Sequence, residues 1–402
     1  MAFTQGISGL NAASRQLDTI GNNIANSQTV GFKSARTEFA DIYAGSKGLG
    51  VQVSGITQGF STGALENTGR DLDLAIDGGG FFRLNDGQQI TYSRNGQFQV
   101  DEQGFMVNGN GARLTGYPVN DPNGANPQVL DGADPVALQI PQADLQANAT
   151  SQASMELNLN SSAETLGAGD IDPADSESYN FTRPITTYDS LGNPQQVNLY
   201  FRKVSSVEDG PSNWSFAAFS NGNQVGESNL VFDSNGQLTD GGEQAISIGL
   251  NNGAESPLNF NLDLAATQFS GESAVRSASQ DGYQAGSFTS LSIAENGNLI
   301  GNYSNEQSRV LGRVALAEFA NEQGLQPMGN NAWTATQSSG QELLGTAGSG
   351  QLGSLRSGTV EASNVDLAGE LVSMIVAQRN YQANAQTIKT QDQILQTVVT
   401  LR

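Results

Sequence analysis

The sequence predicts a multidomain, mainly β protein in which one β-rich domain is inserted into another and α-helices at the N- and C-termini pair as a coiled coil. Three observations carry this prediction. At both ends, apolar residues recur at alternating three- and four-residue steps, which is the period of a coiled-coil seam. The interior is rich in Gly, Asn and Asp and alternates apolar and polar residues between turn sequences. With 402 residues and 48 Gly, the chain is too long for one core and favours strands and turns.

The first helix is expected within residues 1–26. Its assembly seam comprises Phe3, Leu10, Leu17, Ile20 and Ile24, with Gly6 and Ala13 at the intervening steps. Three glycines, Gly6, Gly9 and Gly21, each cost a helix about 1 kcal/mol relative to Ala. A short helix with this composition is marginal alone. We therefore expect it to become ordered when it packs against a partner.

The last helix is expected to begin at the capping-box pair Ser363 and Asp366 and to run to Arg402. Its seam comprises Leu371, Met374, Tyr381, Ile388, Leu395 and Val399, interrupted by Gln378, Ala385 and Asp392. The two seams can close on each other within one chain or pack between copies. Packing between copies is favoured, because polar seam residues such as Gln378 set register. The stripe is also widened by Leu367, Ile375, Ile394 and Val398.

The strand and turn pattern divides the chain into nested parts. Strands are expected at residues 72–76, 92–100, 154–159, 194–204, 214–219, 258–264 and 310–319. A polar, Pro-containing stretch at residues 118–146 marks a boundary. The expected layout is a terminal helical domain (1–30 and 364–402), a connector (31–70 and 359–363), a first β domain (71–144 and 285–358) and an inserted outer β domain (145–284).

Composition excludes several classes of function. The chain has no His and no Cys, so a Ser-His-Asp triad and thiol chemistry are absent, and we expect no catalytic residue, cofactor or metal. The net charge of -22 argues against nucleic acid as a partner. No apolar run approaches the roughly 20 residues that span a bilayer, so membrane insertion is not expected. The first residues lack the basic and apolar regions of a cleaved signal peptide.

An alternative interpretation is a secreted, acidic, β-rich binding protein or carbohydrate-active protein. Its only plausible chemistry is a pair of carboxylates such as Asp71 and Asp73. Alternate acids on one strand more often form a solvated face. The glycine pattern at residues 348–353 and the acidic run at residues 170–177 are likewise better explained as loops.

A motif follows the first helix: Ala25, Asn26, Thr29, Gly31, Phe32 and Lys33 within the segment Ala-Asn-Ser-Gln-Thr-Val-Gly-Phe-Lys. This segment resembles the N-terminal signature of bacterial flagellar rod and hook proteins. The residues 72–76, 92–98, 311–317 and 378–382 resemble other parts of the same family. The pair Val360-Glu361 stands where the family commonly has Leu-Glu. Length and the insert at residues 145–284 resemble hook members rather than the shorter rod members.

The resemblance implies a non-enzymatic subunit that forms a homopolymer, the flagellar hook, a flexible universal joint that transmits torque from rod to filament in motility. It implies export by the flagellar type III apparatus, without a cleaved signal peptide, to an extracellular position in the flagellum. It also implies flagellar rod protein, hook-filament junction protein and hook cap as partners. In this arrangement the terminal helices form the inner layer of a tube and the β domains form outer layers.

Overall fold

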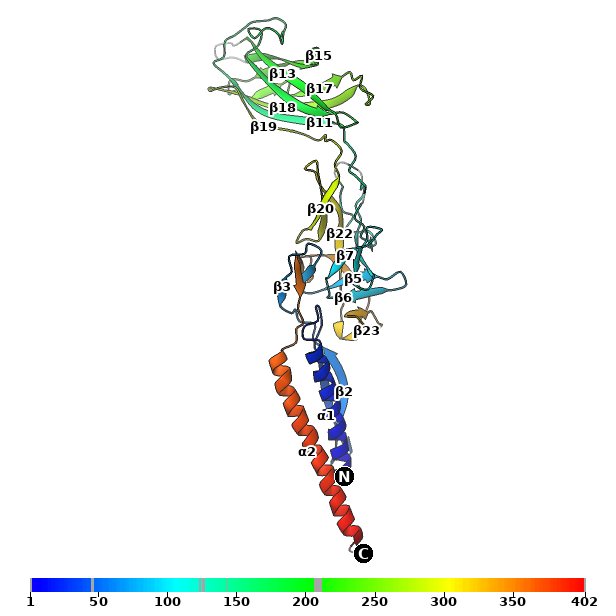
Figure 1. Ribbon diagram of the computed structural model, residues 1–402. Helices are drawn as coiled ribbons and strands as arrows, with labels where there is room; N and C mark the ends of the chain where they lie inside the picture. Colours follow the sequence, from blue (N-terminus) through cyan, green and yellow to red (C-terminus); the bar gives the residue numbers. More distant parts are fainter. Residues whose placement is uncertain are drawn as a thin grey trace.

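The chain forms an elongated molecule with its two helices at one end and a β domain at the other (Figure 1). The computed structural model describes residues 2–44, 47–122, 124, 127–141, 143–205 and 212–400. Helix α1 spans Ala2–Ala25 and helix α2 spans Leu367–Thr400. The two helices lie side by side, so the two ends of the chain meet at the same end of the molecule. The predicted fold class, mainly β with paired terminal helices, is confirmed.

The first helix is covered on a second side by a β-hairpin. Strands β1 (Ala35–Ala44) and β2 (Lys47–Gln58) pair antiparallel and pack along α1. The hydroxyl oxygens of Thr19 and Thr37 lie 2.8 Å apart, and Gln5 Nε2 donates to the carbonyl of Gly48 at 2.7 Å. The sequence pattern indicates only a connector at residues 31–70, so the hairpin is not predicted. We call α1, α2, β1 and β2 together the helical part.

The central β body contains a 12-stranded sheet with the order β20-β21-β22-β9-β5-β6-β24-β23, and with β7, β8, β10 and β25 paired at its sides. Two short pairs, β4 with β26 and β3 with β27, complete the β body next to the helices. The bounds are β3 Leu65–Asn67, β4 Leu74–Asp77, β5 Phe81–Asn85, β6 Ile90–Ser93, β7 Phe98–Val100, β8 Met106–Asn108, β9 Arg113–Tyr117, β10 Val136–Ala137, β20 Phe288–Ile293, β21 Asn298–Tyr303, β22 Ser308–Glu318, β23 Gln326–Gly329, β24 Ala332–Thr334, β25 Leu343–Thr346, β26 Ser354–Ser357 and β27 Thr359–Glu361; a 3₁₀ turn covers Glu322–Gly324.

Strand β22 links two apolar clusters of the β body. Val314 and Leu316 pack with Phe82 and others in the larger cluster, whereas Ala317 belongs to a smaller cluster rich in aromatic residues. The larger cluster is made from strands on both sides of the outer domain in sequence, since its members include Leu74, Leu84, Phe98, Leu114 and Leu299. The β body therefore folds around residues from both halves of the chain.

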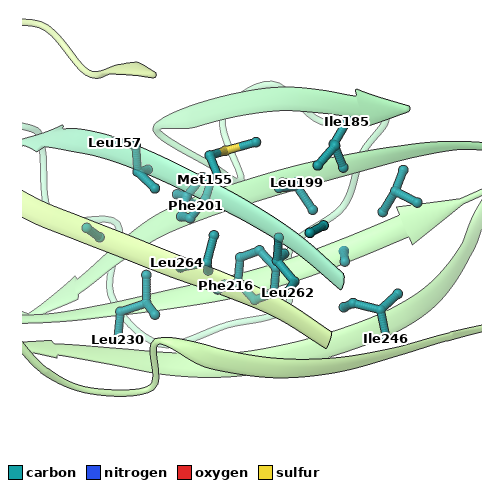
Figure 2. Close-up of a cluster of buried hydrophobic side chains, with 14 of the residues drawn as sticks. Met155, Leu157, Ile185, Leu199, Phe201, Phe216, Leu230, Ile246, Leu262 and Leu264 are labelled. Carbon is teal, nitrogen blue, oxygen red and sulfur yellow. The ribbon is translucent and has the colours of Figure 1, made fainter. Parts of the chain in front are cut away.

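The outer domain is a sandwich of two sheets. One sheet has the order β17-β18-β11-β19 and the other the order β12-β13-β14-β15-β16. The bounds are β11 Gln152–Asn160, β12 Phe181–Tyr188, β13 Pro194–Ser205, β14 Ser212–Ser220, β15 Asn223–Phe232, β16 Leu238–Asp240, β17 Glu243–Ile248, β18 Leu258–Phe269 and β19 Ala274–Gln280. Apolar residues alternate along β11 and β18 and meet those of the facing sheet, as Figure 2 shows for Leu157, Leu264 and Phe216. This alternation is the signal from which the strands are predicted.

Two adjacent segments connect the outer domain to the β body. Leu145 pairs with Gly286 and Asn148 pairs with Tyr283 in isolated antiparallel bridges. The carboxylate of Asp281 accepts hydrogen bonds from the backbone N–H groups of Ser151 and Gln152. The entry and exit of the outer domain are thus held together at its base.

Candidate assembly surface

The seam residues of α1 are mostly covered by the rest of the chain. Ile20 is buried, Leu10, Leu17 and Ile24 are partly buried, and Phe3 near the free end is 42% exposed. Apolar packing against α2 and the hairpin explains why a helix of this composition is placed here.

The seam residues of α2 are divided between two environments. Met374 and Ile388 are partly buried, whereas Leu371, Tyr381 and Leu395 are 46%, 37% and 53% exposed. The backbone of Val399 lies within α2, and its side chain lies outside the described residues. The structure therefore buries part of the predicted seam and leaves the rest exposed to a third or more.

Glycines set the closest approach of the two helices. A Cβ added at Gly6 would lie 3.1 Å from Ile388 Cγ1, and one added at Gly9 would lie 2.7 Å from Asn384 Oδ1. A Cβ at Gly21 would meet nothing within 4 Å. Sequence analysis treats all three as helix-weakening residues, but Gly6 and Gly9 have a packing role that Gly21 lacks.

Large apolar surface remains exposed on α2, near its start and again near its end. It comprises Leu367 (45%), Leu371 (46%), Val372 (62%), Ile375 (51%), Val376 (49%), Ile394 (50%) and Leu395 (53%). Exposed apolar patches on a protein surface mark interaction sites. We call these seven residues the α2 outer face.

The helix start differs from the predicted capping box. Helix α2 begins at Leu367, one residue after Asp366, so Ser363 lies before the cap position. The Ser363 hydroxyl instead accepts a hydrogen bond from the backbone N–H of Val365 at 3.3 Å. The neighbouring Asn364 makes more contacts, because its side chain bonds to two other segments of the chain. Its Oδ1 accepts from the backbone N–H of Ser34 at 2.7 Å and its Nδ2 donates to the carbonyl of Gly59 at 2.6 Å.

The signature segment forms the turn between α1 and the hairpin. Ala25 ends α1, and Thr29 donates to the side-chain oxygen of Asn26 at 3.2 Å. The backbone N–H of Phe32 donates to the carbonyl of Thr29 at 3.1 Å. Gly31 has φ +71°, and a Cβ there would lie 2.5 Å from the backbone nitrogen of Asn95. Only Gly meets both requirements.

The signature lysine is buried in an ion-pair cluster that joins distant parts of the sequence. The side chains of Lys33, Arg94 and Glu361 are each 1% exposed. Lys33 Nζ lies 2.7 Å from Glu361 Oε1, and Arg94 Nη1 lies 3.3 Å from Glu361 Oε2. We call these three residues the junction cluster. Lys33 belongs to the signature motif, and Arg94 and Glu361 lie in other stretches that resemble the family, but the sequence pattern does not predict that the three meet.

Burial and neighbouring charge shift the titration of this region. Burial lowers the pKa of Lys33 and the positive charge of Arg94 lowers it further, whereas Glu361 opposes the shift. Burial raises the pKa of the nearby Glu322, against the opposing effects of Arg94 and Lys33. The junction cluster alone carries one more positive than negative charge, and Glu322 supplies the balancing carboxylate.

The carboxylates considered for an enzymatic alternative occupy different environments. Asp73 is buried and its Oδ1 lies 3.7 Å from Arg70, whereas Asp71 is exposed. Within the described ranges, His, Cys, Asp and Glu side chains form no group of three or more suited to a metal ion. No helix in the described part of the chain is long and apolar enough to cross a membrane.

Family models match the chain along most of its length. The model described as "Flagella basal body rod protein" matches residues 4–33, and "Flagellar hook protein FlgE/F/G D1 domain" matches residues 75–156. The model "Flagellar basal body protein FlaE D2 domain" matches residues 156–283, and "Flagellar basal body rod FlgEFG protein C-terminal" matches residues 356–401. These models define an axial component of the bacterial flagellum.

Relatives narrow this class. The chain is 49% identical to the flagellar hook protein FlgE of Escherichia coli K12 over 411 residues, with 100% of both chains covered. It is 34% identical to the FlgE of Borreliella burgdorferi, with 99% of this chain and 98% of the relative covered. The crystal structure of Helicobacter pylori FlgE2 matches the fold with a TM-score of 0.56 at 15% identity, covering 72% of this chain and 99% of the other. The chain belongs to the family of flagellar hook proteins.

Proposed function

We propose that this chain, a structural subunit of the flagellar hook, polymerises into a tube through the α2 outer face. The single observation that carries the proposal is the exposure of that face beside an α1 that is already covered. Burying the α2 outer face between subunits removes apolar surface from water, and each Å² removed stabilises an assembly by about 25 cal/mol. Further copies of the same chain supply matching helices.

The proposed division of labour follows the layers of the molecule. The helical part forms the inner layer, where apolar packing between copies transmits torque. The β body and the outer domain form outer layers, whose contacts slide as the tube bends. Most of the excess of acidic over basic residues falls between residues 119 and 285, and this supports a solvated outer layer.

The proposed domain bounds remain 1–30 and 364–402, 31–70 and 359–363, 71–144 and 285–358, and 145–284. The proposed partners are the flagellar rod protein at one end of the tube, the hook-filament junction protein at the other, and a transient hook cap. The proposed route to the hook is the flagellar type III export apparatus. A glycine-containing α1 with few buried side chains supports travel in an unfolded state.

Electron microscopy of the purified full chain tests the function. We expect tubes to form as the concentration is raised. Chains that stay monomeric under these conditions contradict polymerisation through this surface, and hydrolysis of a carbohydrate by such monomers would support the enzymatic alternative instead.

A further inference from the structure

Both chain segments that join the helical part to the β body pass the carboxylate of Glu361, and so does the turn between α1 and β1. Lys33 lies between α1 and β1, Gly63 lies between β2 and β3, and Glu361 ends β27 just before α2. Glu361 Oε1 accepts from Lys33 Nζ at 2.7 Å and from the backbone N–H of Gly63 at 2.8 Å. The contacts therefore bring the two crossings and the turn between α1 and β1 together at one side chain.

The other oxygen of Glu361 is tied to the β body. Glu361 Oε2 accepts from Arg94 Nη1 at 3.3 Å, and the same nitrogen donates to the carbonyl of Gly78 at 2.9 Å. The Arg94 guanidinium also lies 5.3 Å from the centre of the Phe81 ring, inside the aromatic cluster of the β body. Glu361 Oε1 thus bonds to the α1–β1 turn and to the β2–β3 crossing, whereas Oε2 bonds to the β body.

A buried ion-pair cluster of this kind contributes more to the relative orientation of the segments that it joins than to the free energy of unfolding. Removing two charges from water costs about as much as their attraction returns, so a buried pair adds little net stability compared with well-packed apolar residues. The hydrogen bonds that Glu361 accepts from Lys33, Gly63 and Arg94, however, require one relative placement of these groups. A cluster at the crossing point with these properties restricts how the helical part can turn against the β body.

We propose that Glu361 is the positioning residue that fixes the orientation of the helical part relative to the β body, with Lys33 and Arg94 acting through it. The proposal rests on the proposed function only in its consequence, which is that torque leaves the inner layer through this junction. The orientation itself is a property of the single chain.

The absence of Cys from the chain makes the test direct. Gln99→Cys on β7 and Gln382→Cys on α2, both at exposed positions, accept spin labels on the two sides of the junction. Pulsed electron paramagnetic resonance then measures the distance distribution in tubes diluted with unlabelled chain. We expect one narrow peak in the otherwise unchanged chain and loss of that peak in Glu361→Gln. The matched control is Glu156→Gln, which removes a carboxylate 3.3 Å from Arg276 in a half-exposed ion pair, and it should keep the narrow peak.

A second variant tests whether the orientation of the helical part can be lost while the chain stays folded. Lys33→Met, Arg94→Met and Glu361→Leu together replace the charges by apolar side chains, and we expect thermal unfolding close to that of the original chain but a broad distance distribution. A narrow peak in both this variant and Glu361→Gln overturns the proposal, as does a broad peak in the unsubstituted chain. Tube formation is scored separately, on the unlabelled, unsubstituted chain. If that chain forms no tubes, the proposed function fails; if tubes form and both variants keep the narrow peak, the role of Glu361 fails and the proposed function stands.

Discussion

Gly9 of α1 faces the side-chain amide of Asn384 on α2, and a Cβ added at residue 9 would lie 2.7 Å from Asn384 Oδ1, so that side chain would have to move. Gly9→Gln should therefore separate the helices, whereas Gly21→Gln, in open space, should strengthen α1 by up to about 1 kcal/mol through helix propensity. Thermal disassembly of tubes, followed by light scattering, measures both. Equal shifts in the two variants would show that Gly9 has no packing role.

The α2 outer face should be required for polymerisation but not for folding of the β domains. Leu395→Asp places a charge in this face, and we expect loss of tubes by electron microscopy with unchanged near-ultraviolet circular dichroism. Leu17→Asp should have the same effect through the partly buried seam of α1. Leu343→Asp is the matched control, because Leu343 is 56% exposed on β25, outside the helical part. Normal tubes from either helix variant would refute the seam assignment.

The free chain should lose its helices to protease before its β domains. Among described residues of the two helices, the buried apolar side chains are Ala12, Ala13, Ile20 and Ala377. So little burial gives low local stability. Limited trypsin digestion should trim the chain to a soluble core near residues 70–360, with early cuts after the exposed Arg379 and Lys389. Mass spectrometry identifies the fragments, and helices that resist trypsin in the monomer would contradict ordering on assembly.

The outer domain should lose stability in acid through Asp189. Burial alone raises the pKa of this carboxyl, but hydrogen bonds from Asn252 and Asn193 outweigh burial and lower the pKa below its ordinary value. A lowered folded-state pKa stabilises the fold above the unfolded pKa of about 3.9, and that stability disappears as the pH falls through the folded value. Asp189→Asn should thus cost roughly 1–3 kcal/mol at pH 7, from unsatisfied buried donors, and much less in strong acid.

Fluorescence-detected unfolding checks this pH dependence. Trp214 is buried in the outer-domain core, and a Trp333→Phe background leaves it as the only tryptophan. The exposed Glu272→Gln serves as control and should not change the pH profile. A constant difference between Asp189→Asn and its parent from pH 7 to strong acid would exclude the linkage.

The alternation of apolar and polar residues predicts most strands, because buried and exposed side chains alternate along each of them. Alternation indicates strands at residues 194–204 and 214–219, and β13 and β14 cover these residues. The hairpin β1-β2 is not predicted because its inner face packs on α1, and the Gly- and Ser-rich sequence carries no clear alternation of its own. Tertiary contact decides that element.

The candidate site is predicted in part for a similar reason. Seam spacing identifies the faces of the helices, but it does not say which residues meet α1, so Ile388 and Leu395 look equivalent until the helices are placed. The junction cluster is harder to predict. Arg94 and Glu361 are charged residues that are usually solvated, and they are buried here only because they meet each other across 267 positions of sequence.

The bridges Leu145 with Gly286 and Asn148 with Tyr283 place the two ends of the outer domain next to each other. A domain attached by neighbouring ends can be removed, enlarged or exchanged without changing the path of the chain on either side. In the proposed tube, the width of the hook would therefore be separable from its inner architecture: residues in the middle of the sequence would determine how far the subunit reaches outward, and the two termini would keep the same packing.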